Sequence, residues 1–286
     1  MRVSATLARH PVLSYAALAF AISWGGVVLA VGPGGFPGTV DEFEALLLPV
    51  VLAMLAGPSV AGLVVIGVAD GRSGLHDLWA RVLTVRVGIR WYLAAIAIAP
   101  LVVAGTLSAL SLASPSFRPG ILSVADPTSH LAIGLLTGLA AGLCEELGWT
   151  GIAVPKLRRR HGALATGLAV GLLWGAWHLL VIWWGSTASA GGVPMAVYLP
   201  VMTLSFLPPY RVLMVWIYDR TQSVGVAMLM HASLTASVRI LDPIGIAGAP
   251  ILIYDSSLGA VLWLVVAGFA SVSVPRPARS TPEAAV

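Results

Sequence analysis

Charged residues and cysteine are scarce in this sequence of 286 residues. Asp, Glu, Lys and Arg together make up 10% of it, whereas a soluble domain carries about 25%. The polar side chains are too few to cover a fold that stands in water. The single cysteine, Cys144, excludes an intramolecular disulfide and any metal site built from several cysteines.

In place of charge, the sequence holds long apolar runs. It is 58% hydrophobic with a mean hydropathy of +0.93, and runs of about 20 apolar residues, the length of a transmembrane helix, recur from end to end. The short alternating segments of a membrane barrel do not occur. We therefore predict an all-α fold, a polytopic transmembrane helical bundle that forms a single membrane domain over residues 1–286. Eight spans are expected, at residues 12–31, 46–69, 91–113, 129–154, 162–184, 194–218, 224–240 and 249–273.

Basic residues alternate between the connections that join these spans. Lysine and arginine gather in the second, fourth and sixth connections and in the tail, whereas acidic residues crowd the first. Because cytoplasmic loops carry the positive charge of membrane proteins, both termini are expected in the cytoplasm. The pI of about 9.6 then indicates anionic lipid, and not nucleic acid, as the partner. We expect a multi-pass protein of the plasma membrane, with an uncleaved first span and a short disordered tail at residues 275–286.

Two adjacent carboxylates, Glu145 and Glu146, interrupt the apolar fourth span. An ionisable side chain in hydrocarbon costs at least a few kcal/mol, so intramembrane carboxylates indicate a functional site by default. Two histidines lie at compatible depths, His178 in the fifth span and His231 in the seventh. These four side chains form the predicted site.

The fourth and fifth spans are joined by a short basic turn around Arg160, so we expect them to pack as antiparallel neighbours. Residues level with each other across this hairpin have numbers that sum to about 323, as those of Glu145 and His178 do. Each lies about 25 Å along its helix from the tip. Glycine recurs at every fourth position before both side chains, which predicts that both lie on packed helix faces rather than facing lipid. These glycines are Gly134, Gly138, Gly142, Gly167, Gly171 and Gly175.

Three chemistries fit a buried carboxylate beside neutral imidazoles. The carboxylate can act as a general base that activates water, while an imidazole and a hydroxyl on a third helix stabilise an oxyanion. Glu145, His178 and His231 can instead bind zinc, although the HExxH pattern of metalloproteases does not occur. A proton relay in a transporter uses the same residue types, but inverted repeats are not visible.

The order and spacing of these residues resemble the CPBP family of intramembrane proteases. That family includes the type II CAAX prenyl endopeptidases and bacterial proteins of the Abi group, which are linked to bacteriocin processing or self-immunity. It carries three motifs on separate helices, EExxxR, FxxxH and HxxxN. The matching residues here are Glu145-Glu146, Trp174 with His178, and His231 with Thr235, and the similarity covers an expected protease core at residues 129–240.

The resemblance implies an endopeptidase that hydrolyses a peptide bond of a membrane-associated or prenylated peptide. Glu145 would be the general base, and His178 would help to hold the water. His231 and Thr235 would form the oxyanion hole, while Glu146 would be a supporting carboxylate paired with an arginine. No metal or other cofactor would then be needed.

Three positions depart from the motifs of that family. Trp174 replaces phenylalanine and keeps an aromatic ring, and Thr235 replaces asparagine and keeps a hydrogen-bond donor. Thr150 replaces the arginine of EExxxR and cannot neutralise Glu146, so Arg211 in the sixth span is the candidate cation. These changes leave an alternative function open, that of a catalytically weakened homologue that binds membrane peptides as an immunity or scaffold protein.

Overall fold

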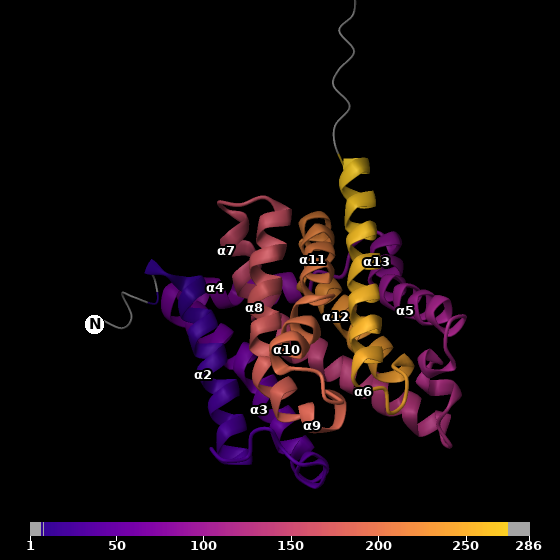
Figure 1. Ribbon diagram of the computed structural model, residues 1–286. Helices are drawn as coiled ribbons and strands as arrows, with labels where there is room; N and C mark the ends of the chain where they lie inside the picture. The colour runs from indigo at the N-terminus through magenta and orange to yellow at the C-terminus, as the bar shows by residue number, and fades with distance from the viewer. Residues whose placement is uncertain (1–6, 8, 274–286) are drawn as a thin grey trace, which may run out of the picture.

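The computed structural model describes residues 7 and 9–273, and that part of the chain is helical without strands (Figure 1). Eight helical segments among the described residues are long and apolar enough to cross a membrane. They confirm the predicted helical bundle and its number of spans. The first six residues and the predicted tail at 275–286 lie outside the described residues.

Six of the eight spans are single helices. They are α2 (Pro11–Val31), α3 (Val40–Ala69), α5 (Ile89–Ser111), α8 (Ala163–Trp184), α12 (Val224–Leu241) and α13 (Ala249–Ser273). The largest difference from the predicted bounds is at α3, which begins six residues early because Thr39 and Glu42 form a capping box. Thr39 Oγ1 accepts from the Glu42 N–H at 3.2 Å, and Glu42 Oε2 accepts from the Thr39 N–H at 2.8 Å. Both N–H groups would otherwise lack a partner at the start of a helix.

The other two spans are broken, and both breaks lie inside the bundle. The fourth consists of α6 (Pro127–Glu146), a π-helical turn η3 (Trp149–Ala153) and α7 (Val154–Arg158). The sixth consists of α10 (Met195–Leu204) and α11 (Leu207–Thr221). Pro208 and Pro209 follow the second break because proline has no N–H to continue a preceding helix but suits a first turn. The breaks bring the end of α6 and the first turns of α11 within hydrogen-bonding distance of each other.

Shorter helices occupy the connections. α4 (Gly71–Val82) follows α3 directly, and the hydropathy pattern does not predict it because it is rich in polar and charged residues. Its apolar side packs Leu78 against Ile66 of α3 and Ile152 of η3. The remaining short helices are η1 (Pro115–Phe117), η2 (Gly120–Leu122) and α9 (Ser186–Ser189).

The helix pairs differ from the predicted hairpin. α6 packs along α12, whereas α8 packs along α10 and α11. The α6 glycines face Ala232, Ala236 and their neighbours on α12, and the α8 glycines face Val212, Pro208 and Thr203. The glycine spacing therefore identifies close packing correctly, but the prediction that the fourth and fifth spans are neighbours is wrong for α6. In the fourth span, η3 and α7 are the parts that pack against α8. The break after Glu146 lets α6 cross the bundle obliquely to α8 (Figure 1).

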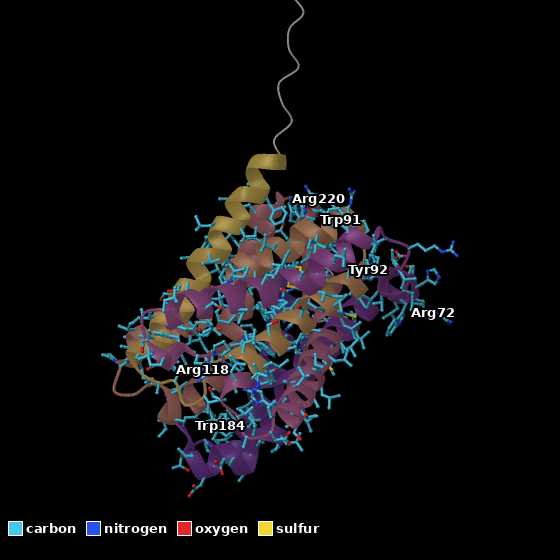
Figure 2. All side chains as sticks on the ribbon, turned by 90° about the vertical axis from the view of Figure 1, so that its right-hand side faces the viewer. Arg72, Trp91, Tyr92, Arg118, Trp184 and Arg220 are labelled. Atoms are coloured by element: carbon cyan, nitrogen blue, oxygen red, sulfur yellow. The ribbon has the colours of Figure 1, made fainter. Side chains whose placement is uncertain are left out.

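The two ends of the bundle differ in charge. The basic turn at residues 156–160 and Arg220, near the end of α11, lie at one end, called the basic end below. Figure 2 shows Arg220 with Trp91 and Tyr92 toward this end, and Arg118 and Trp184 toward the opposite end. Which end faces the cytoplasm stays a prediction.

Candidate active site

Glu146 and Arg211 form an ion pair that is fully buried within the bundle. Arg211 Nη1 lies 2.9 Å from Glu146 Oε1 and 2.8 Å from Oε2, and neither side chain is exposed. Removing two charges from water costs several kcal/mol for each, so such a pair depends on good geometry and on further hydrogen bonds.

Two more side chains bind Glu146. The Thr150 hydroxyl, one turn further along the chain, donates to Oε2, and His231 Nδ1 lies 2.7 Å from Oε1. Arg211 in addition stacks on Trp174, with its guanidinium carbon 4.3 Å from the ring centroid, which is a cation–π contact. The cation that the family motif places at position 150 is therefore supplied by Arg211 from another helix, and Thr150 acts as a hydrogen-bond donor.

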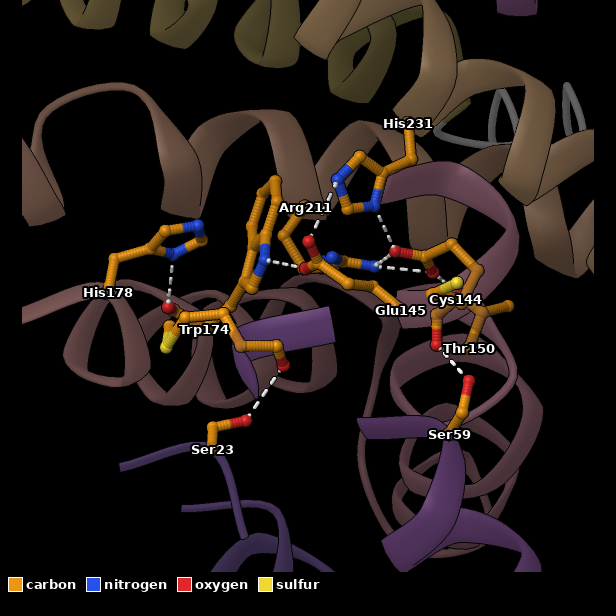
Figure 3. A network of polar contacts seen from close by, with 11 residues as sticks. Ser23, Ser59, Cys144, Glu145, Thr150, Trp174, His178, Arg211 and His231 are labelled. Carbon is orange, nitrogen blue, oxygen red and sulfur yellow. Dashed lines mark hydrogen bonds and ion pairs between the residues drawn. The ribbon is translucent and has the colours of Figure 1, made fainter. Parts of the chain in front are cut away.

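Glu145, the preceding residue, lies between Trp174 and His231 (Figure 3). Its Oε2 accepts a hydrogen bond from Trp174 Nε1 at 2.9 Å, and its Oε1 lies 3.9 Å from His231 Nε2. Only 4% of Glu145 is exposed, which confirms that it lies on a packed helix face. His231 is held between the two carboxylates, with Nδ1 on Glu146 and Nε2 toward Glu145.

His178 follows Trp174 by one turn of α8, and its Nδ1 lies 2.9 Å from the Trp174 carbonyl oxygen. Because a carbonyl only accepts, we assign the proton of the neutral ring to Nδ1, which leaves a lone pair on Nε2. Trp174 and Trp177 pack edge-on against the imidazole, with ring centroids 5.6 and 4.7 Å away. The residue in direct contact with Glu145 is thus Trp174, one turn before the position that the hairpin prediction selects.

A cavity of about 270 Å³ opens beside Glu145. Trp174, His178, His231 and Thr235 line it together with Glu145, and most of the remaining wall is apolar. Glu146 and Arg211 lie behind this wall, bound to His231 and stacked on Trp174 respectively. The structure therefore brings the seven predicted site residues together in two layers, one that faces the cavity and one that supports it.

The proposed zinc ligands are not arranged as a metal site. Within the part of the chain that the structure describes, no three His, Cys, Asp or Glu side chains are grouped closely enough to hold a metal ion. His231 already has Nδ1 on Glu146, and His178 has Nδ1 on its own helix. Glu145, His178 and His231 do not form such a group among the described residues.

Two serines outside the motifs support the site and are missed by the sequence reasoning. Ser59 Oγ donates to the Cys144 carbonyl, and Ser23 Oγ donates to the Met54 carbonyl at 2.8 Å (Figure 3). The second bond does have a sequence signal, because Pro58 has no N–H and so leaves the carbonyl four residues earlier without its helical donor. No local pattern pairs Ser59 with Cys144, since α3 and α6 meet only in the folded bundle.

Residues 127–237 match the family model described as Type II CAAX prenyl endopeptidase Rce1-like. The match begins at the start of α6 and ends within α12, so it contains all seven predicted site residues. It confirms the resemblance to the CPBP family. No curated protein matches the chain.

Proposed function

We propose that this chain, whose residues 127–237 match the Rce1-like type II CAAX prenyl endopeptidases, is an intramembrane endopeptidase of the cell membrane in which Glu145 activates the attacking water. The observation that carries the proposal is the position of the Glu145 carboxylate. It lies on the wall of an apolar cavity with His178 and His231, and the Glu146–Arg211 pair stands behind it.

The first step is addition of water to the scissile carbonyl. Trp174 Nε1 donates to Glu145 Oε2, so Oε1, which lies 3.9 Å from His231 Nε2, is the oxygen that acts as the base. Glu145 takes a proton from a water that it shares with His178, and the water oxygen bonds to the carbonyl carbon. His231 acts here as an imidazolium, with Nδ1–H donating to Glu146 and Nε2–H available to the substrate. Its Nε2–H and the Thr235 hydroxyl one turn later donate to the oxyanion that forms.

The second step breaks the peptide bond. Glu145 returns the proton to the leaving nitrogen as the C–N bond breaks, so the products are a carboxylic acid and an amine and Glu145 is again a carboxylate. Glu146 stays out of the proton transfer in this mechanism. Bound by Arg211 and Thr150, it fixes the His231 ring through Nδ1.

The substrate is a peptide that can leave water for an apolar cavity. Its wall is formed mainly by side chains such as Met54, Trp177, Leu207 and Leu234, and burying apolar surface against them contributes about 25 cal/mol per Å². A membrane-embedded or lipid-modified peptide fits this chemistry.

The test uses purified protein in liposomes with quenched fluorescent hydrophobic peptides, each prepared with and without a farnesylated cysteine. Cleavage by the native protein and its loss in Glu145→Gln are expected, because the amide cannot take a proton from water. Thermal melting of both proteins controls for folding. Peptide binding without cleavage by the native protein, or equal cleavage by Glu145→Gln, would contradict the proposal.

A further inference from the structure

The cavity beside Glu145 extends in one direction along the bundle. On three of the helices that line it, the lining residues extend away from the basic end: to Thr137 before Glu145 on α6, to Val181 after His178 on α8, and to Arg239 after His231 on α12. α12 begins beside the basic end, where Ser223 Oγ donates to the Thr84 carbonyl. The cavity therefore runs from the proposed base toward the opposite end of the bundle.

On the side of the basic end, the site is closed by buried groups. Arg211 and Glu146 fill the space behind His231, and neither is exposed. Trp149 and Tyr15 pack edge to face beyond them, with centroids 5.2 Å apart, and both are fully buried. A peptide that approached from the basic end would have to displace the ion pair and both rings.

The wall of this cavity includes one arginine side chain, that of Arg239. It is exposed, lies in the last turn of α12 and lines the same cavity as Glu145. It lies eight positions after His231 on α12, which is about 12 Å along a helix. An extended peptide covers that distance in three to four residues at about 3.3 Å each.

No carboxylate among the described residues lies within ion-pair distance of Arg239. Asp242 acts on it electrostatically, but Asp242 Oδ1 accepts a hydrogen bond from the Tyr254 hydroxyl at 2.7 Å. The Arg239 guanidinium thus stands at the edge of an apolar cavity with its charge only partly balanced. An anionic group on a ligand in the cavity would complete that balance.

We propose that peptides enter the cavity from the end opposite the basic end, and that Arg239 binds a substrate carboxylate three to four residues from the scissile bond. The carboxylate belongs to an acidic side chain or to the end of the peptide chain. This second part rests on the proposed function, because a scissile bond exists only if the protein cleaves peptides. With the predicted orientation, substrate reaches Glu145 from the non-cytoplasmic face.

The direction of entry and the charge preference can be measured without any activity. Val238→Cys is placed on the cavity wall in a Cys144→Ser background, and intact cells are treated with anionic and cationic methanethiosulfonates that do not cross membranes. Labelling from outside is expected. Relative to each reagent's rate with a free thiol in solution, it should be at least threefold faster with the anionic ethylsulfonate than with the permanently charged ethyltrimethylammonium reagent. Arg239→Gln should abolish that preference, and Arg239→Glu should reverse it.

Arg159→Cys in the basic turn is the matched control for sidedness, and it should be labelled only after the cells are permeabilised. If Val238→Cys behaves like Arg159→Cys, entry from the opposite end is wrong. Equal rates with the two reagents, or rates that ignore Arg239→Gln, would overturn the anion site. All of these results stand whether or not the protein cleaves peptides.

A second measurement tests the site on substrate. Apolar peptides are compared with a free or amidated C-terminus, and with Asp or Asn three or four residues from the scissile bond. Arg239→Gln is expected to raise KM at least tenfold for the acidic peptides, with kcat within about twofold and neutral peptides unaffected. If amidation of the C-terminus removes the effect of Arg239→Gln, the terminal carboxylate is bound. If replacement of Asp by Asn removes it, the side-chain carboxylate is bound.

An unchanged KM for the acidic peptides would overturn the site. An effect of Arg239→Gln that appears only in vesicles containing phosphatidylglycerol, and not in pure phosphatidylcholine, would assign Arg239 to a lipid phosphate and also overturn it. Complete absence of cleavage by the native protein would contradict the proposed function, while the labelling experiment would still decide the entry side and the anion preference.

Discussion

Arg211 on α11 is bound to Glu146 on α6 through a single nitrogen, Nη1, which lies within 2.9 Å of both carboxylate oxygens. The two residues are 65 positions apart in the chain. In the motif of the resembling family, the arginine follows the second glutamate by four residues on the same span. Here a neighbouring helix supplies it, so the charge balance of the site is kept although the motif is not.

Removing one charge of the Glu146–Arg211 pair should destabilise the protein more than the removal of both charges would suggest. Arg211→Gln and Glu146→Gln each leave one buried charge without its partner, which typically costs about 3–5 kcal/mol. The double variant leaves none and should lose clearly less than the sum of the single losses. Free energies of unfolding in detergent measure this, with exposed Arg118→Gln as the control, expected within about 0.5 kcal/mol of the native protein. Additive losses would show that the two charges do not interact.

Restoring the motif arginine should harm this protein. Thr150 is 1% exposed and its hydroxyl already donates to Glu146, while Arg211 occupies the other side of the carboxylate. Thr150→Arg would bring two guanidinium groups against one carboxylate, so a lower melting temperature and weaker cleavage are expected. Arg211→Leu in the same chain should recover both, because one cation then remains. A faster and equally stable Thr150→Arg variant would contradict the observed pairing.

The number and position of the spans can be predicted from sequence because both follow from bilayer thickness. About 20 apolar residues are needed to cross, and that count is local information. The capping box at Thr39 and Glu42 is local as well, and it explains why α3 begins before its apolar run.

Which helices pack together, and how each is rotated, could not be predicted in the same way. The turn that follows Glu146 depends on Gly148, which packs against the Pro58 carbonyl and Tyr15 from two other helices. That turn sends α6 along α12 and makes Trp174, rather than His178, the direct partner of Glu145. The chemical identity of the candidate site is thus readable from the sequence, whereas its contacts depend on tertiary packing.

The carboxyl of Asp242, which ends α12, should make stability depend on pH. Burial raises its pKa from the ordinary 3.8 to about 7, against the opposing effects of the Tyr254 hydrogen bond and of Arg239. Between these two values the folded protein holds a proton that the unfolded chain has released, so stability falls as pH rises through this range. Melting temperatures in detergent at pH 5 and pH 8 should differ less in Asp242→Asn than in the native protein.

Asp126, at the start of α6, provides the control for that measurement. Hydrogen bonds from Ser129 lower its pKa below the usual range, so its contribution to stability is lost only in acid, below pH 4. Asp126→Asn should therefore leave the difference between pH 5 and pH 8 unchanged. If both variants reduced the difference in melting temperature between pH 5 and pH 8 equally, Asp242 would not be the titrating group.

The choice between a carboxylate base and a metal ion can be made on active protein. No step of the proposed mechanism uses zinc, so elemental analysis of the purified active protein should show no stoichiometric zinc. Dialysis against a chelator should leave the cleavage rate unchanged. About one zinc per chain, lost in His178→Ala, would instead make the imidazoles ligands and require the roles of Glu145 and His178 to be reassigned.

The sharpest test of the site concerns Trp174, because motif and structure predict opposite results for one substitution. The family motif has phenylalanine at this position, so Trp174→Phe should be harmless if only the aromatic ring matters. In the structure the indole N–H holds Glu145 Oε2 at 2.9 Å, and a hydrogen bond to a charged group contributes about 1.5–3 kcal/mol. We therefore expect kcat to fall at least tenfold, with little change in KM or melting temperature.

Trp177, one turn along the same helix, is the matched control. It is as deeply buried as Trp174 and lines the same cavity, but its indole nitrogen has no hydrogen-bond partner among the described residues. Trp177→Phe removes the same atoms without removing a bond, so kcat should stay within about threefold of the native value. Equal losses in the two variants would mean that ring volume, and not the bond to Glu145, sets the rate. No loss in either would mean that Glu145 is oriented by other groups, and the indole would then have no part in positioning the base.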